Sequence, residues 1–191
     1  YPRATIRFCL MFKPLLYFFI IGIVGVFSSQ LIGFVQTTYQ FAFTLGDVVA
    51  SSMMMSVIVF TLSTLLMAWI VNIVGKGFGG KGNFKQMFRA LCLTNIPYIW
   101  ILPVLLFWMQ LSPESYFEMP GFELTIGDHI MMFIGPLLII LASAWVIFLI
   151  LKAVQEVHRF SFWKAVFTNA VMLVAFVTIM ILLSATGIQF Y

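Results

Sequence analysis

The chain has 191 residues, of which 63% are hydrophobic and only 8% are charged. Soluble globular domains carry about a quarter of their residues as charged side chains, so this composition excludes an ordinary soluble enzyme or binding domain and predicts an integral membrane protein. The net charge of +4 is then interpreted as a membrane-topology signal, and we expect no nucleic-acid partner.

Five apolar segments are long enough to cross about 30 Å of hydrocarbon as helices, which takes about 20 residues. In chain order they are residues 15–35, 48–74, 91–111, 130–151 and 165–184. Because only short loops separate them, we predict an all-α integral membrane protein in which residues 1–191 form one domain, a five-helix transmembrane bundle. Prolines in the third and fourth spans are expected to kink their helices: Pro97, Pro103 and Pro136.

Small residues recur along the first two spans at helical spacing. The first span has Gly25, Ser29 and Gly33, four residues apart. The second has Ser52, Ser56 and Ser63. Small side chains let membrane helices approach one another closely. We therefore predict that both sets lie on faces that pack against other helices or against a partner protein.

Between the second and third spans, residues 75–83 read GKGFGGKGN. Gly75, Gly77 and Gly80 have the spacing of a dinucleotide-binding loop, but that loop must follow a strand. It follows instead residues 48–74, which contain no charge and no proline and are far longer than a buried strand of 4–8 residues. We interpret the glycines as a flexible turn between two spans and expect no nucleotide.

The residues after the glycines have the pattern of a short amphipathic helix. Phe84 and Phe88 fall on its apolar side with Met87 and Leu91, while Lys85 and Arg89 turn away. We predict that this helix lies in the headgroup layer and that Asn83 caps it. It contributes to a candidate cytoplasmic interface: Arg3, Arg7, Phe84, Lys85, Phe88, Arg89 and Trp163.

Charge placement predicts the orientation of the chain. All ten Lys and Arg lie before the first span, between the second and third, or between the fourth and fifth. Five of the six acidic residues lie in the two opposite loops. Because Lys and Arg are retained on the cytoplasmic side during insertion, we predict a cytoplasmic N-terminus, an outside C-terminus and a place in a cell membrane, the bacterial cytoplasmic membrane.

Three amides lie near the predicted cytoplasmic border, on the second, third and fifth spans: Asn72, Asn95 and Asn169. An amide that loses water needs another hydrogen-bond partner. Either at least two of them bond across the bundle, or the interface hydrates all three. We propose the first and retain the second as an equal alternative.

Reactive groups do not converge in this sequence. Asp47 and Asp128 each begin a span, where they could form the paired carboxylates of an intramembrane aspartyl protease or cap helices; capping is favoured because each carboxylate meets free N–H groups there. The span interiors contain no Asp, Glu, Lys, Arg or His, which weighs against ion-coupled transport. We expect no catalysis, no metal and no cofactor.

Three stretches resemble the bacterial branch of the Yip (Ypt-interacting protein) family: residues 2–14, 81–98 and 151–166. The resemblance implies a five-helix membrane protein without known catalysis. Eukaryotic relatives contact small GTPases in vesicle traffic, but they carry a long N-terminal region that this chain as given lacks, so GTPase binding is not expected. Bacterial members are expected to accompany transport machinery, including ABC-type exporters.

These observations favour a non-catalytic accessory or scaffold subunit, whose partners are the lipid bilayer and other integral membrane proteins such as ABC-type exporter subunits. The alternative is a passive conduit or lipid-handling protein, with the proline-containing third and fourth spans lining a cavity.

Overall fold

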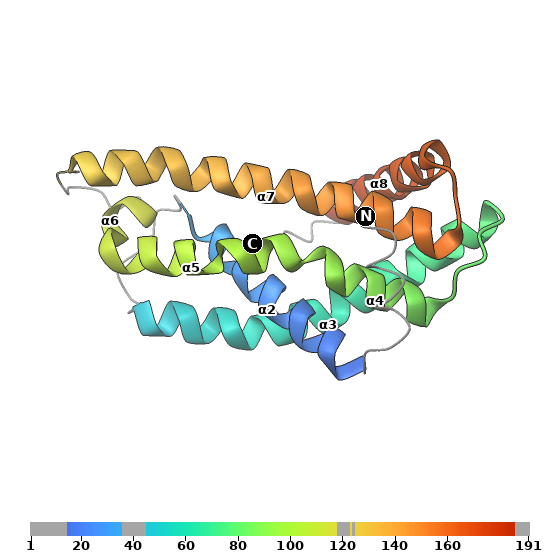
Figure 1. The fold of residues 1–191 in the computed structure, drawn as a ribbon, viewed down its shortest axis with the longest axis horizontal. Coiled ribbons are helices and arrows are strands. Elements are labelled where there is room, and N and C mark those ends of the chain that lie inside the picture. The colour runs from blue at the N-terminus through green and yellow to red at the C-terminus, as the bar shows by residue number, and fades with distance from the viewer. Residues whose placement is uncertain (1–14, 36–44, 118–122, 124, 186–191) are drawn as a thin grey trace.

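The computed structural model describes residues 15–35, 45–117, 123 and 125–185, with the backbone alone for residues 175, 176 and 179–185. All regular structure in these ranges is helical (Figure 1). The elements are α2 (Leu15–Gly33), α3 (Leu45–Gly77), α4 (Phe84–Thr94), α5 (Ile96–Leu111), α6 (Pro113–Tyr116), α7 (Ile126–His158) and α8 (Phe162–Ala185).

The prediction of an all-α membrane protein is confirmed. Four stretches of described helix are long and apolar enough to cross a membrane, namely α2, α3, α4 with α5, and α7. The fifth predicted span coincides with α8, which has 24 residues. At about 1.5 Å per residue, the 33 residues of α3 and of α7 run about 50 Å, so both helices extend beyond a hydrocarbon core of about 30 Å.

The five predicted spans do not pack equally into the helix bundle. Helices α3, α5 and α7 run along the long axis of the molecule. Helix α8 is strongly foreshortened in Figure 1, so it runs mostly along the line of sight and makes a large angle with that axis. Only α3 and α7 make extensive contacts with α8, and the contact uses its first half, where Ala165, Thr168 and Met172 are buried.

The third predicted span is divided into two helices at Asn95. Its backbone ends α4, and Pro97 lies in the first turn of α5. Proline has no N–H to donate, which costs nothing in a first turn but removes a hydrogen bond in a helix interior, so Pro97 begins a helix and does not kink one. Pro103 and Pro136 lie inside α5 and α7.

Helix α7 begins with a reciprocal cap. The backbone N–H and the hydroxyl of Thr125 each donate to Oδ2 of Asp128 at 2.7 Å, and the N–H of Asp128 donates back to the Thr125 hydroxyl at 3.3 Å. Hydrogen bonds from Ser112 and from Thr125 hold the pKa of Asp128 below its usual range. A capping carboxylate kept ionised in this way supports the capping interpretation over a proton-sharing protease pair.

Helix α3 packs through one narrow stripe in which every fourth residue is buried: Val48, Ser52, Ser56, Phe60, Thr64, Ala68 and Asn72. Ser52 and Ser56 therefore do share a packing face. The inclusion of Ser63 in that face was wrong, because Ser63 is exposed and Thr64 takes its place. Rows of residues four apart form the ridges by which helices pack, and Ser63 lies outside this row.

The small-residue seam of α2 differs from the predicted one. Gly22, Gly25 and Ser28 are buried, whereas Ser29 is half-buried and donates to the carbonyl of Val26 in its own helix at 2.8 Å. Gly33 is exposed and has no atom within 4 Å of where a Cβ would be. Within the described residues the predicted seam thus meets neighbouring helices closely only at Gly25, because these helices cover a face that follows a three-residue spacing; contact of Ser29 and Gly33 with a partner protein stays a prediction.

Close contacts of α2 explain its buried glycines. A Cβ on Gly22 would overlap the ring of Phe60 in α3, and one on Gly25 would overlap Asn95 at the junction of α4 and α5. One hydrogen bond reinforces the contact with α5, because the Ser28 hydroxyl donates to the carbonyl of Tyr98 at 2.7 Å.

The predicted hydrogen bonds of at least two asparagines across the bundle are not found among the described residues. Nδ2 of Asn95 donates to the carbonyl of Leu91 at 3.2 Å, and Nδ2 of Asn169 donates to the carbonyl of Ala165 at 2.8 Å, each within one turn. Oδ1 of Asn72 is buried and has no hydrogen-bond partner. A carbonyl four residues earlier on the same helix is always within reach, so it satisfies an amide without help from a neighbour.

Two apolar clusters fill the interior. One lies at the end where α4 meets the last turns of α7, and the other at the end of α6, where Trp108, Tyr116 and Phe117 pack edge to face. Nε1 of Trp108 donates to the Ser115 hydroxyl at 2.8 Å, and the Tyr116 hydroxyl donates to the carbonyl of Leu31 at 2.7 Å. These bonds connect α6 to α5 and to α2.

We expect Tyr116→Phe to lower the free energy of unfolding by about 1 kcal/mol, the usual loss for one hydrogen bond. The loss stays moderate because the carbonyl of Leu31 still accepts from the N–H of Phe34 at 3.0 Å. Denaturation by SDS titration in mixed micelles measures it. Thr61→Val is the control, because it also removes one hydroxyl, and that hydroxyl donates to the carbonyl of Val57 within its own helix; equal stability of Tyr116→Phe and the parent chain would contradict the prediction.

Candidate functional site: the basic end of the bundle

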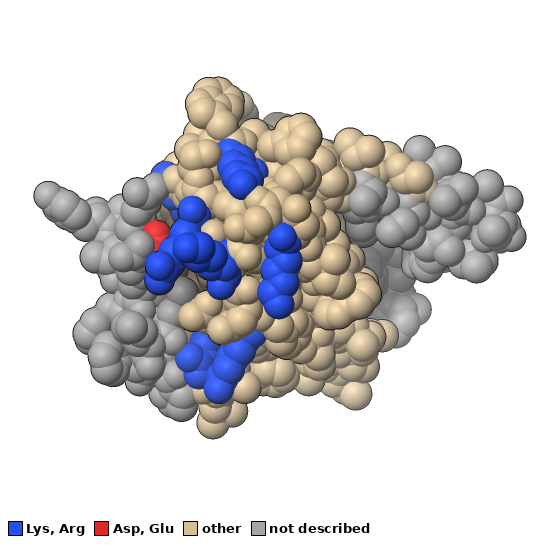
Figure 2. Space-filling model, turned by 90° about the vertical axis from the view of Figure 1, so that its right-hand side faces the viewer, with Lys and Arg blue, Asp and Glu red and all other residues tan. Residues whose placement is uncertain are grey.

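Lys and Arg side chains gather at one end of the molecule (Figure 2). Those that the structure describes are Lys76, Lys81, Lys85, Arg89, Lys152, Arg159 and Lys164. The prediction that the basic segments share one end is thus confirmed for the described residues. That this end faces the cytoplasm stays a prediction, and Arg3 and Arg7 lie outside the described residues.

Helix α4 begins as predicted but is placed differently. The Asn83 side chain accepts from the N–H of Gln86 at 2.9 Å, which confirms the cap. Met87, Phe88 and Leu91 are buried in the protein core, so the apolar face of α4 packs on protein and not on lipid, and its position in the headgroup layer stays a prediction. Helices α2, α3 and α7 contact α4 and cover its apolar face, which a sequence pattern cannot distinguish from burial in lipid.

The two cations of α4 have different surroundings. Lys85 is exposed, whereas Arg89 is half-buried, with its guanidinium 5.5 Å from the ring centroid of Phe18 in α2. Arg89, which was expected to turn away from the apolar side of α4, therefore lies against another helix. A guanidinium is weakly hydrated and stacks on aromatic faces, which lets Arg89 connect α4 to α2. Phe84 remains partly exposed and stacks on Phe88.

The glycine loop, residues 75–83, is an ordered helix end and not the flexible turn that we predicted. Gly79 has φ +78°, and its N–H donates to the carbonyl of Lys76 at 2.8 Å. The N–H of Gly80 donates to the carbonyl of Gly75 at 2.8 Å. This is the Schellman arrangement that ends helices at a left-handed residue. The loop follows helix α3, so the strand that a dinucleotide loop requires is not there.

Three glycines of this loop close on the side chain of His158. A Cβ on Gly75 or on Gly80 would overlap the imidazole, and one on Gly82 would lie 2.6 Å from Cγ1 of Val157 and 3.0 Å from Nδ1 of His158. The N–H of Lys81 donates to the carbonyl of His158 at 3.4 Å. The glycines are thus needed for close approach to the end of α7.

The imidazole of His158 is enclosed and has no polar contact. Its exposed fraction is 1%, and neither ring nitrogen has a hydrogen-bond partner. The ring stacks on Phe160 at 5.4 Å between centroids, and Nζ of Lys164 lies 4.9 Å from the Phe160 centroid. His158 follows Lys152 and lies outside the predicted span, residues 130–151. Burial, and then the charge of Lys76, hold its pKa below the ordinary value of 6.5.

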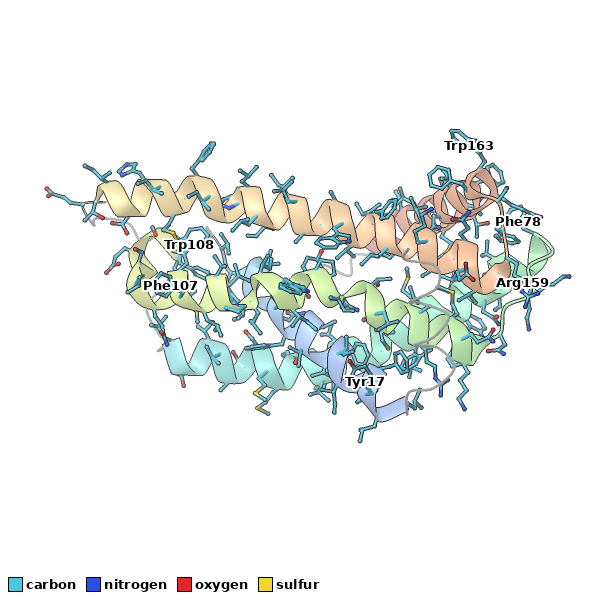
Figure 3. All side chains as sticks on the ribbon, viewed as in Figure 1. Tyr17, Phe78, Phe107, Trp108, Arg159 and Trp163 are labelled. Carbon is cyan, nitrogen blue, oxygen red and sulfur yellow. The ribbon has the colours of Figure 1, made fainter. Side chains whose placement is uncertain are left out.

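The turn from α7 to α8 completes the basic end. Arg159 has φ 56°, and the N–H of Phe160 donates to the carbonyl of Gln155 at 2.9 Å. Figure 3 shows Arg159 and Phe78 at this end, with Trp163 projecting from the first turn of α8. Trp163 is 78% exposed, so this predicted interface residue is available for contact with lipid or protein.

The sequence patterns assigned no separate role to His158. The signal was present in the loop, because three glycines beside a capped helix indicate that something approaches the backbone closely. Among the described residues, no group of three or more His, Cys, Asp and Glu comes together. The contact between the glycine loop and His158 holds two helix ends together. The expected lack of catalysis and cofactors stays a prediction.

Comparison with known proteins gives one match. The family model described as the Yip1 domain matches residues 10–185, which is most of the chain. No curated protein and no solved structure matched this chain in the same comparison.

Proposed function

The chain belongs to the Yip1 domain family, and from that premise we propose that it is a non-catalytic accessory or scaffold subunit that binds other integral membrane proteins. The family match and the long apolar helices support the coarser statement that it is a membrane protein. The family resemblance favours transport machinery such as an ABC-type exporter as the partner, in a cell membrane.

The outward surface of α3 is the observation that carries this proposal. Because the middle of α3, residues 53–67, packs mainly through the stripe that contains Ser52 and Ser56, most of its circumference there is exposed. Met53, Met54 and Met55 are all more than half exposed. Methionine is flexible and polarizable and adapts to irregular partner surfaces, and membrane helices associate mainly by such packing. The surface suits a partner helix.

The interior weighs against the conduit alternative. That alternative requires a cavity between α5 and α7, where prolines were expected to kink both helices. Trp108 of α5 is fully buried there, and its indole lies so close to Gly135 of α7 that a Cβ would overlap it. A large aromatic ring pressed against a glycine fills the space between two helices. This contact supports a packed scaffold.

Mild solubilisation from native membranes, affinity capture and mass spectrometry of the retained proteins tests the proposal. We expect a membrane protein to be retained with the parent chain, and Met54→Trp to reduce its yield about tenfold, equivalent to about 1.4 kcal/mol. Ile140→Trp is the matched control on α7, since Ile140 is similarly exposed. A chain that purifies alone, or two variants that retain the partner equally, would overturn the proposal.

A further inference from the structure

We propose that the glycine loop and the end of α7 form a pH-sensitive latch, closed on neutral His158 and opened when that imidazole takes up a proton. The latch joins α3, α4 and α7, because the loop ends α3, leads into α4 and packs on the last residue of α7. It is independent of the proposed partner-binding function.

The closed state leaves no room to hydrate a charged ring. Gly75, Gly80 and Gly82 surround the imidazole, and Phe160 stacks on it. Both ring nitrogens of His158 are buried without a hydrogen-bond partner. A neutral imidazole tolerates such an apolar enclosure, but an unpaired buried cation does not. Protonation therefore favours a state in which the loop has moved away and water reaches the ring.

The elements that meet at this end of the molecule carry mostly positive charges. They are Lys76 on α3, Lys81 in the loop, Lys85 and Arg89 on α4, Lys152, Glu156 and Arg159 on α7, and Lys164 on α8. Glu156 is the single acid among them, and residues two apart on a helix do not face each other. The charge of Lys76 opposes a proton on His158.

The direction of the pH dependence follows from proton linkage. The closed state binds the proton more weakly than the open state, so the two states are equally protonated well above pH 6.5, the ordinary pKa of histidine. Below it, the open state is protonated first, and the closed state loses stability as the pH falls. The population of the open state should rise about tenfold per pH unit until His158 is protonated in the closed state as well.

Hydrogen exchange of the loop amides, in the full chain in lipid nanodiscs, tests the latch. After correction for the intrinsic pH dependence of exchange, protection of the amides at 79–81 should fall about tenfold or more between about pH 7.5 and about pH 5.5. His158→Phe keeps an aromatic ring beside Phe160 and should abolish the change. His129→Gln is the matched control, because His129 is the other histidine of the chain and is exposed.

A second measurement does not depend on the folding of His158→Phe. NMR of the His129→Gln chain with labelled histidine follows the titration of the His158 imidazole alone. Its midpoint should lie below 6.5, in the same range in which loop protection is lost. A midpoint at or above 6.5, protection that does not change with pH, or an unchanged pH response in folded His158→Phe would overturn the proposal.

Discussion

Replacing Gly25 with leucine is expected to lower the free energy of unfolding by about 3 kcal/mol, the upper part of the range for overpacked interiors. The site is crowded by backbone as well as by a side chain. A Cβ at Gly25 would overlap Cβ of Asn95 and lie 2.9 Å from its carbonyl oxygen. Asn95 cannot turn away as the end of a flexible side chain could, because it is the junction at which α4 ends and α5 begins.

Gly33→Leu supplies the matched control in the same helix. Gly33 has open space on the side where a Cβ would project, so leucine there should change stability by no more than about 0.5 kcal/mol. SDS titration of both variants, with helicity and tryptophan fluorescence as signals, measures the two effects. If the two leucines destabilised the chain equally, the contact between Gly25 and Asn95 would not determine how α2 packs.

The sequence predicted which segments are helical better than it predicted which side of each helix is buried. Length and apolarity decide whether a segment forms a membrane helix, and each of the five predicted spans coincides with helix in the described part of the chain. Which side of α2 faces inward depends on where α3 and α5 lie. That is why Gly25 meets a neighbouring helix and Gly33 does not, although both fit a small-residue pattern.

The same limit explains the errors at the basic end. An apolar stripe on α4 is consistent with lipid or with protein on that side, and the structure shows protein around Met87 and Phe88. His158 was overlooked because its surroundings come from a segment about 80 residues earlier in the chain. Sequence spacing identifies a cap such as Asn83, which acts within one turn, but it does not show which helix ends meet across the bundle.

The pairing of the glycine loop with His158 yields the second large effect, because two nearby glycines should respond to the same substitution with opposite signs. Both Gly75 and Gly77 lie in the last turns of α3. Alanine at Gly77, which has nothing within 4 Å, should stabilise the chain by up to about 1 kcal/mol through lower entropy of the unfolded state. Alanine at Gly75 would overlap the imidazole and should lower the free energy of unfolding of the chain by about 1–3 kcal/mol.

A double-mutant cycle assigns the loss at Gly75 to the imidazole. His158→Ala removes the ring that the new methyl group would strike, so Gly75→Ala should cost little or nothing in that background, with a coupling energy of about 1–3 kcal/mol. SDS titration at about pH 8, above the ordinary pKa of histidine, keeps the ring neutral and separates packing from protonation. If Gly75→Ala destabilises the chain equally with and without the imidazole, the glycine is required for some reason other than close approach to His158.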